Sequence, residues 1–446
     1  MSSRPWARKG DPMASNADWV KRAYQIFPGA SLGSFYLPEN QEFVVHRGQG
    51  SRVWDADGRA YLDYVMGSGP MVLGHAHPEV VAAVRHQIEH GSTFYGLNEL
   101  AIRLGEKIVA AAPCAEALKF CGSGAEATFY ALRLARAATG RPKVLKFEGG
   151  YHGHHDYAMM SVSPARLPAF PTPVPDSAGI PDEVERQVLI APFNDLATTA
   201  DIVRRHREEL AAVIVEPLNR MLEPLPGFLE GLRQVTHDVG AVLVFDEVVT
   251  GFRIGWGGAQ ELYGVTPDVA TYGKIIGGGL PLAAVAGRRD LLELANPRKK
   301  GAPDYVYASG TLNGNPLSSC AGLATLAVLE RAGAYARLNA IGEALRTGLR
   351  GIVGRLGLGA QVLGRGPLAN IYFSPDPITD YRSSLKADSR ITQGLGRGLL
   401  RRGVLTNLTA KMYLSLAHSD ADIQETLQAF EDALKEVAPK ASGRSA

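Results

Sequence analysis

Residues 241–281 read AVLVFDEVVTGFRIGWGGAQELYGVTPDVATYGKIIGGGLP. The segment opens with an apolar run that ends at Asp246, and a second run, from Val269 to Tyr272, ends just before Lys274. Short apolar runs bounded by glycine and charge are typical of strands buried on both faces of a parallel sheet. Ligands of open α/β sheets bind at the carboxyl ends of such strands. We therefore expect Asp246 and Lys274 to face one crevice.

This pair of residues suits one kind of cofactor. A lysine can form an imine with an aldehyde, and a carboxylate can hold a proton on a pyridine nitrogen. A phosphate-loop role for Lys274 is excluded, because GxxxxGK would need glycine at position 268, which is Asp268. A surface lysine is the usual alternative, but the apolar run before Lys274 and the IIGGGLP after it indicate an interior position.

The same segment resembles the signature of the class III aminotransferases, which are pyridoxal-phosphate (PLP) enzymes of fold type I. Among them it is similar above all to the glutamate-1-semialdehyde aminomutase branch, and the resemblance runs from about residue 28 to residue 427. It implies an α/β fold, with a large domain built on a mostly parallel sheet covered by helices and a smaller α+β C-terminal domain. It also implies that Lys274 is the catalytic residue and holds PLP as a Schiff base, with Asp246 at the ring nitrogen.

Composition limits the class of protein. A chain of 446 residues exceeds one ordinary core, so we expect more than one domain. A net charge of +2 argues against a nucleic-acid partner, and no apolar run approaches the ~18 residues of a membrane span. Three cysteines without a CxxC motif favour a reducing, cytoplasmic location.

The pattern of elements predicts three parts. Residues 1–65 form an N-terminal segment with a tail, a helix over 16–27 and a hairpin over 43–64 that turns at Asp57-Gly58; the resemblance implies that this segment packs on the dimer partner. Residues 66–325 alternate helix and strand, which predicts a PLP-binding domain with a parallel sheet. Residues 326–446 form the small domain, ending in a polar tail over 438–446. The large-domain strands are expected at 117–121, 143–147, 188–191, 212–215, 241–245, 269–272 and 282–286.

A phosphate site is predicted where Gly122-Ser123-Gly124-Ala125 joins a strand to a helix. Helix N-termini offer free N–H groups and partial positive charge, which suit a phosphate dianion. Alone, such a turn is a weak signal, and it is not the GxSxG of a hydrolase. By resemblance, Ser123, Gly124 and Ala125 bind the cofactor phosphate.

The run Gly150-Tyr151-His152-Gly153-His154-His155 follows a predicted strand. Its histidines, like those of the HxHP at positions 75–78, allow a metal site at first sight, but no carboxylate or cysteine set completes one, and we predict no metal. Tyr151 is instead expected to stack on the cofactor ring, with a core tyrosine as the alternative.

The resemblance assigns further contacts. Glu216 supports the cofactor environment, Asn219 reaches its phenolic oxygen, and Val248 packs on the ring face opposite Tyr151. Thr311, in a stretch that resembles GTxxGNP, binds the phosphate of the neighbouring subunit's cofactor. The chain is therefore expected to form a homodimer with shared active sites.

The proline-rich segment 161–181 predicts a long surface loop. It follows directly on the Tyr151 motif, which favours an active-site lid, and an inert excursion remains the alternative.

The residues expected to bind the substrate differ from those of the branch that the chain resembles. The branch carries an arginine soon after a PGG, whereas this chain reads PGASLGSFYLPEN over residues 28–40 and has no arginine from there to Arg47. The glutamate that the branch carries before LSLAH is also absent, with Ala410 and Lys411 nearby. Losing an arginine clamp removes a strong contact to a carboxylate. We expect an aminotransferase that uses an amine or amino acid, including a β-amino acid or a donor lacking an α-carboxylate, and a keto acid or aldehyde. Tyr36 and Arg220 are the candidate substrate contacts. Glutamate-1-semialdehyde aminomutase is the alternative, and a racemase or decarboxylase on the same scaffold is a further one.

Overall fold

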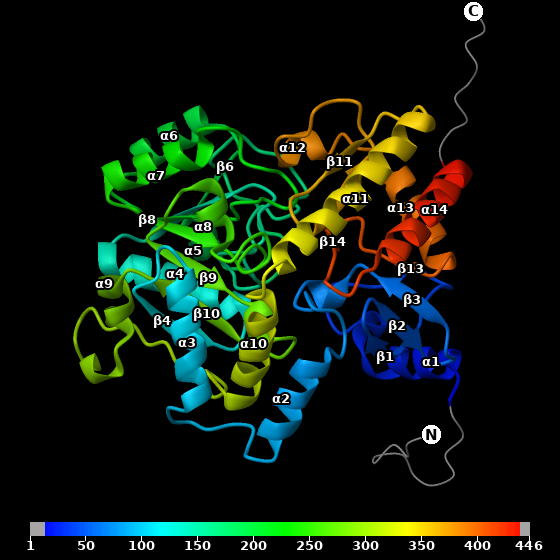
Figure 1. Cartoon of the computed structure of the whole chain (residues 1–446). Helices are drawn as coiled ribbons and strands as arrows, with labels where there is room; N and C mark the ends of the chain where they lie inside the picture. Colours follow the sequence, from blue (N-terminus) through cyan, green and yellow to red (C-terminus); the bar gives the residue numbers. More distant parts are fainter. Residues whose placement is uncertain (1–13, 438–446) are drawn as a thin grey trace, which may run out of the picture.

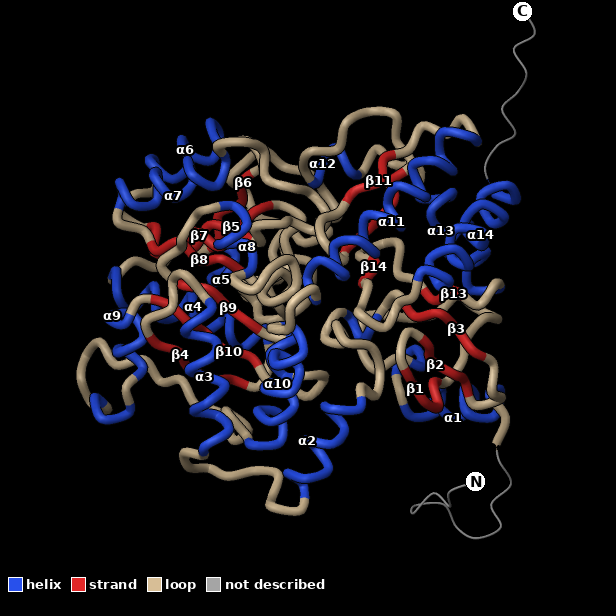
Figure 2. The backbone as a smooth tube through the Cα atoms, viewed as in Figure 1, coloured by secondary structure: helices blue, strands red, loops and turns tan. Residues whose placement is uncertain are grey.

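A seven-stranded sheet forms the centre of the large domain in the computed structural model, which describes residues 14–437 (Figures 1 and 2). The strand order is β4-β10-β9-β8-β7-β5-β6. Their bounds are β4 Ala117–Cys121, β5 Lys143–Phe147, β6 Val188–Ala191, β7 Leu210–Val215, β8 Val242–Asp246, β9 Val269–Tyr272 and β10 Ala283–Gly287. All seven predicted strands are present, with ends that differ by two residues or fewer.

Six strands run in one direction and β10 runs against them, so the prediction of a mostly parallel sheet is confirmed. The connection from β9 to β10 explains the exception. It spans residues 273–282 and contains only the short 3₁₀ helix Lys274–Gly277. A parallel crossover needs a dozen or more residues, so the chain turns back and pairs antiparallel. Lys274 lies at this turn.

Helices cover both faces of the sheet (Figure 1). On one face, α4 (Gly124–Thr139) packs with Val144 of β5 and Val244 of β8. On the other, Leu145 and Phe245 of the same strands join a larger core with α3 (Glu99–Ala111), α7 (Phe228–Val239) and α10 (Pro316–Leu329). Alternate residues of each strand thus enter different cores. The remaining helices of the large domain are α2 Pro78–Ile88, α5 Asp182–Glu185, α6 Leu196–Arg205, α8 Gly258–Tyr263 and α9 Arg289–Leu292.

The small domain packs helices on a three-stranded sheet. The sheet has the order β11-β12-β14, and the long helix α11 connects it to the large domain. Its elements are α11 Ala334–Arg355, β11 Gln361–Leu363, β12 Leu368–Tyr372, α12 Tyr381–Ser384, α13 Ser389–Arg401, β14 Met412–Tyr413 and α14 Asp420–Val437. The α+β character predicted for this region is present.

The N-terminal segment joins the small domain within one chain (Figure 1). Helix α1 (Asn16–Ile26) begins with a capping box from Ser15 and Asp18. The expectation of one hairpin over 43–64 is wrong, because a second turn at Gly50, with φ +58°, gives three strands. These are β1 Val45–Gln49, β2 Arg52–Asp55 and β3 Ala60–Asp63, and β13 (Val404–Leu405) pairs parallel with β3. The turn predicted at Asp57-Gly58 lies between β2 and β3.

Within residues 14–437, none of the helices combines the length and the apolar character needed to span a bilayer. The predicted tails lie outside the described residues, over 1–13 and 438–446.

Candidate active site

Asp246 ends β8 with its carboxylate held from three directions. Its Oδ2 lies 2.8 Å from Nδ1 of His152, and its Oδ1 accepts from the Thr271 hydroxyl (3.2 Å) and the Val248 N–H (3.1 Å). Asp246 is 5% exposed and His152 is 1% exposed. These contacts fix the carboxylate at the carboxyl end of the sheet, where the sequence places it.

Lys274 follows β9, the strand that neighbours β8. Its backbone is left-handed, with φ +50°, a conformation that is uncommon away from glycine and often marks functional sites. Burial lowers the pKa of the Lys274 ammonium, and the positive charge of Lys411 acts in the same direction. Lowering this pKa favours the neutral amine, which is the form that attacks carbonyl groups and accepts protons.

The predicted phosphate turn lies against the same site. Ser123 caps α4, and its hydroxyl accepts from the Glu126 N–H. A Cβ placed on Gly124 would lie 3.0 Å from Cγ1 of Val248, and a Cβ on Gly273 would lie 3.2 Å from the same atom. A Cβ on Gly153 would lie 2.5 Å from Cα of Ala125. The structure thus brings the phosphate turn together with Val248 and with the residue preceding Lys274.

Two buried polar atoms without partners face this site. His152 Nε2 and Asn219 Oδ1 make no hydrogen bond within the described residues, and a Cβ on Gly150 would lie 3.2 Å from the first and 3.7 Å from the second. Leaving buried acceptors or donors unpaired is costly, so a ligand that satisfies them fits here. Tyr151, next in the chain, is 45% exposed, as a residue that stacks on a ligand would be before the ligand binds.

Glu216 and Arg220 follow β7 and are linked to each other. Glu216 Oε2 accepts from the Arg220 N–H at 2.9 Å and lies 3.9 Å from Nζ of Lys411. Burial raises the pKa of Glu216, but the charges of Lys411 and Arg220 outweigh it and leave this pKa below its ordinary value. The Arg220 side chain donates to the carbonyl oxygens of Gly149 (2.6 Å) and Val162 (3.4 Å).

The structure does not draw Tyr36 and Thr311 into the crevice of a single chain. Tyr36 is 79% exposed, and its side chain makes no hydrogen bond within residues 14–437. Thr311 is also exposed, in a turn tied to the large domain by the bond from Tyr130 to the Ser309 carbonyl.

The segment 161–181, predicted to be a long loop, is fixed at several points. Ser161 N–H donates to the Val174 carbonyl at 2.7 Å, and Asp176 accepts from the N–H groups of Val162 and Ser163. Arg382 of α12 donates to the Pro168 carbonyl and also pairs with Glu148. These contacts join the loop to both domains.

Two residues of the site escaped the sequence prediction. The sequence indicates His152 only as a possible metal ligand. Its place next to Tyr151, which is expected at the same ring as Asp246, is the one signal for its contact with Asp246. Lys411 was noted only as a departure from the related branch. Its position before a short strand gave no sign that it faces Glu216 across the two domains.

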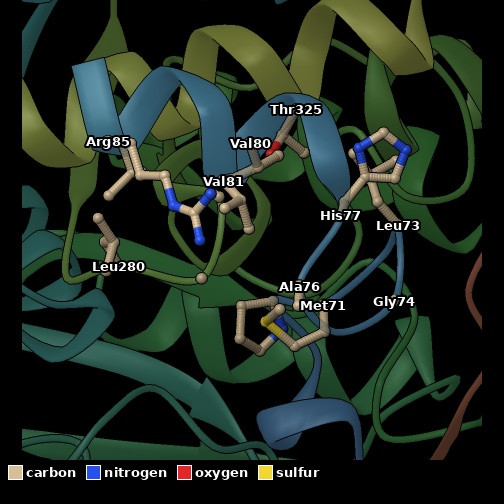
Figure 3. A pocket seen from close by; sticks show the side chains of 14 residues that line it. Met71, Leu73, Gly74, Ala76, His77, Val80, Val81, Arg85, Leu280 and Thr325 are labelled. Atoms are coloured by element: carbon tan, nitrogen blue, oxygen red, sulfur yellow. The ribbon is translucent and has the colours of Figure 1, made fainter. Parts of the chain in front are cut away.

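A separate apolar pocket of about 270 Å³ adjoins the loop that follows Lys274 (Figure 3). Met71, Val80, Val81 and Leu280 line it together with Arg85, as Figure 3 shows. Asp246, Lys274 and Ser123 are not among its lining residues, so it is not the cofactor crevice. In the part of the chain that the structure describes, no cluster of three histidine, cysteine or acidic side chains could hold a metal ion.

Comparisons with known proteins show which family has this site. A glutamate-1-semialdehyde 2,1-aminomutase of Desulforudis audaxviator is 44% identical over 428 residues, covering 94% of this chain and 97% of the relative. An ω-transaminase structure from Sphaerobacter thermophilus matches with a TM-score of 0.91 and 34% identity, over 96% of this chain and 99% of that one. A β-phenylalanine aminotransferase from Variovorax paradoxus matches with a TM-score of 0.84 and 33% identity, over 94% of each chain.

The cofactor follows from the same comparisons and from the fit of the site. Solved structures with this fold hold PLP or its amine form. Here a lysine, a buried carboxylate, a helix N-terminus and unpaired polar atoms lie close together at one edge of the sheet, as PLP requires. Residues 36–434 match the family model described as aminotransferase class III, and the chain belongs to this family of PLP-dependent enzymes.

Proposed function

We propose that the enzyme is an aminotransferase that moves an amino group from an amine or amino acid, including a β-amino acid, to a keto acid or aldehyde. The reaction class rests on one observation: Lys274 and the Asp246 carboxylate lie at the ends of neighbouring strands beside the phosphate turn. When bound, PLP supplies the aldehyde that takes up the amine and the ring that accepts electrons from the reacting carbon.

Residues of the chain bind the cofactor and move the proton. Asp246, oriented by His152 and Thr271, holds a proton on the ring nitrogen and so favours electron withdrawal. Nζ of Lys274 would attach the cofactor, and its free amine would take the proton from the substrate carbon and deliver it to the cofactor carbon that carries the amino group away. Ser123, Gly124 and Ala125 bind the phosphate at the start of α4. Tyr151 and Val248 enclose the ring, while Glu216 and Asn219 fix its polar edge.

The substrate side supports transamination over isomerisation. Residues 28–46 contain no arginine, so an arginine clamp for a carboxylate does not come from this segment. The Arg220 guanidinium holds backbone carbonyls, and Tyr36 remains a candidate contact from an exposed loop. The structural similarity to ω-transaminase and β-phenylalanine aminotransferase agrees with donors whose carboxylate is absent or further from the amine.

Exposed apolar side chains support a homodimer with shared active sites. In the single chain, helix α2 leaves Ile88 exposed and its three valines only half-buried. The Asn98 side-chain amide donates to the Gly314 carbonyl and so joins the segment before Asn98 to the turn that contains Thr311. Their exposed apolar residues are Phe94, Tyr95, Leu97, Tyr307 and Leu312. A patch of this kind marks an interface, and it would place Thr311 at a partner subunit's cofactor.

Glutamate-1-semialdehyde aminomutase is the second candidate, because the curated relatives carry that name at 40% identity or more. Steady-state assays with β-amino acids, simple amines and glutamate semialdehyde separate the two. An aminotransferase converts a donor and an acceptor into a new carbonyl compound and a new amine. Turnover of glutamate semialdehyde alone, giving 5-aminolevulinate, would establish the isomerase instead. A cytoplasmic location is also proposed, since the three cysteines are free and buried.

A further inference from the structure

Lys411 is held rigidly at the edge of the crevice by the small domain. It directly precedes β14, which pairs with β12. Asn370 of β12 donates from Nδ2 to the carbonyl oxygens of Leu408 (3.1 Å) and Ala410 (2.9 Å). The turn before Lys411 is therefore fixed to the sheet, and the position of the Lys411 backbone is set before any substrate binds.

The Lys411 side chain crosses to the large domain without finding a hydrogen-bond partner. Its Nζ lies 3.9 Å from Oε2 of Glu216, and each side chain is 8% exposed. This distance exceeds a hydrogen bond, and Nζ makes none to another side chain or carbonyl within residues 14–437. An ammonium carries three donors, and burying them without acceptors is costly. The Lys411 ammonium therefore keeps donors that an anionic ligand would satisfy.

The other cations of the crevice are already engaged. Arg220 binds the carbonyls of Gly149 and Val162. Arg253 donates from Nε to the Val249 carbonyl and from Nη2 to the Gly69 carbonyl. Its third nitrogen, Nη1, is buried, and the whole residue is 1% exposed, so a substrate does not reach it. Lys274 is the reacting amine. Among the described cations beside Lys274, Lys411 is the one whose charged group makes no hydrogen bond, and its charge acts to lower the pKa of Lys274.

The geometry points to Lys411 as the residue that binds the substrate carboxylate, with a keto acid acceptor or a β-amino acid donor as the class of ligand. This inference rests on the proposed function only in requiring a substrate that reacts at Lys274. It also accounts for the absence of an arginine over residues 28–46, because the carboxylate contact moves from the N-terminal segment to the small domain. The ligand carboxylate would lie near Glu216, and the positive charge of Lys411 would offset the negative charges of both carboxylates.

Two aminooxy compounds test this contact without requiring turnover. Aminooxyacetate and methoxyamine both react with the aldehyde of the bound cofactor, and only aminooxyacetate carries a carboxylate. We expect the PLP-loaded enzyme to prefer aminooxyacetate, measured from the change in cofactor absorbance. Lys411→Met should lower this preference by about 10- to 100-fold, the effect of losing a charge-assisted contact. Lys411→Arg should retain most of it.

Lys386→Met is the matched control, because it removes a lysine from an exposed position of the same domain. The preference of this variant should equal that of the unmodified enzyme. Equal loss of both affinities in Lys411→Met would show that the lysine only supports Glu216, and would overturn the inference. No preference for aminooxyacetate in the unmodified enzyme would overturn it as well, whether or not the variants fold. Failure of the proposed transamination would appear separately, in the product assays.

Discussion

The cofactor side and the substrate side of the crevice are built in different ways. On the cofactor side, Asp246 and His152 are at most 5% exposed and are fixed by hydrogen bonds at the ends of buried strands. On the substrate side, Tyr36 is 79% exposed, and Lys411 reaches Glu216 from the small domain. Apart from the proposed phosphate contact of the partner subunit's Thr311, the first region is built on one sheet edge of a single chain, whereas the second depends on a loop and on a lysine from the small domain.

This difference separates chemistry from specificity. Any substrate uses the same lysine and the same ring acid, so these residues belong to a rigid sheet edge. Specificity is set by segments that can change without disturbing the sheet. Relatives with one fold can therefore be transaminases or aminomutases, depending on the residues that contact the substrate.

Replacing Lys274 by alanine should have the largest effect. The reaction loses both the cofactor attachment and the proton-transfer base, so the transfer rate should fall by about 10²- to 10⁴-fold or more. Single-turnover absorbance measurements with added PLP and an amine donor would measure this loss. Lys386→Ala, at an exposed site, serves as the control. Undiminished transfer by Lys274→Ala would remove the lysine from the mechanism.

Asp246→Asn and Glu247→Gln compare two adjacent buried acids. If Asp246 holds the proton on the ring nitrogen as proposed, its amide variant should lose about 10²-fold or more of kcat. Glu247 instead accepts from Ala259 N–H, Thr250 and Gln260, and burial raises its pKa. Glu247→Gln should cost about 1–3 kcal/mol of stability with kcat largely kept. Kinetics and thermal unfolding would test this, and equal kcat losses would contradict the division of roles.

Thr311→Ala tests the shared site on the partner-facing surface. If its hydroxyl binds a cofactor phosphate across the interface, the variant should release PLP about 10- to 100-fold more readily. Equilibrium dialysis of PLP measures this, and Thr379→Ala, at an exposed position of the small domain, is the control. A variant that binds PLP as tightly as the control would place Thr311 outside the cofactor site.

Tyr36→Ala should have a smaller effect, confined to substrate binding. Loss of one aromatic contact corresponds to about 1 kcal/mol, or roughly fivefold in KM, with kcat retained.

Arg220→Ala should differ, because its side chain holds the Gly149 and Val162 carbonyls beside the Tyr151 loop. It should lower kcat together with cofactor affinity. Donor panels for both variants are the measurement, and unchanged kinetics for every donor would exclude these residues as contacts.

His418 should make the smallest and most specific contribution, to stability rather than to activity. Burial lowers the pKa of His418 to about 4, against 6.5 in the unfolded chain. The unfolded state therefore takes up a proton first, and stability is lost as the pH falls from 6.5 toward 4. The difference is about 2 kcal/mol at pH 5. His418→Gln, although less stable at pH 7, should show a flatter decline in unfolding experiments. If the stabilities of His418→Gln and of the unmodified enzyme fell in parallel as the pH is lowered, this role would be contradicted.

The fold was largely predictable because its strands are continuous apolar runs. β5, β6 and β9 occur at the expected residues, since a buried parallel strand leaves a distinct local pattern. Helix α13 was not predicted, because Gly394, Gly396 and Gly398 weaken its local helix signal. A Cβ on Gly398 would lie 2.8 Å from Cβ of Ala433, so this glycine allows close packing on α14. Tertiary contact decides such a helix, and a single sequence does not reveal it.

The site divides in the same way. Asp246, Lys274 and the Ser123 turn stand at strand ends, where order along the chain indicates position in space. Lys411 and Glu216 are 195 positions apart and meet only because the small domain folds over the sheet edge. The side-chain bonds of Arg220 depend in the same way on the path of the loop after β5. Such contacts follow from the arrangement of domains, which local pattern does not encode.

The central claim is that Lys274 carries the cofactor. Borohydride reduction of the PLP-loaded enzyme, followed by peptide mass spectrometry, tests it most directly. The account predicts a single pyridoxyl adduct on Lys274, which the Lys274→Ala enzyme lacks. Labelling of Lys411 in place of Lys274, or the absence of any stable adduct, would contradict it.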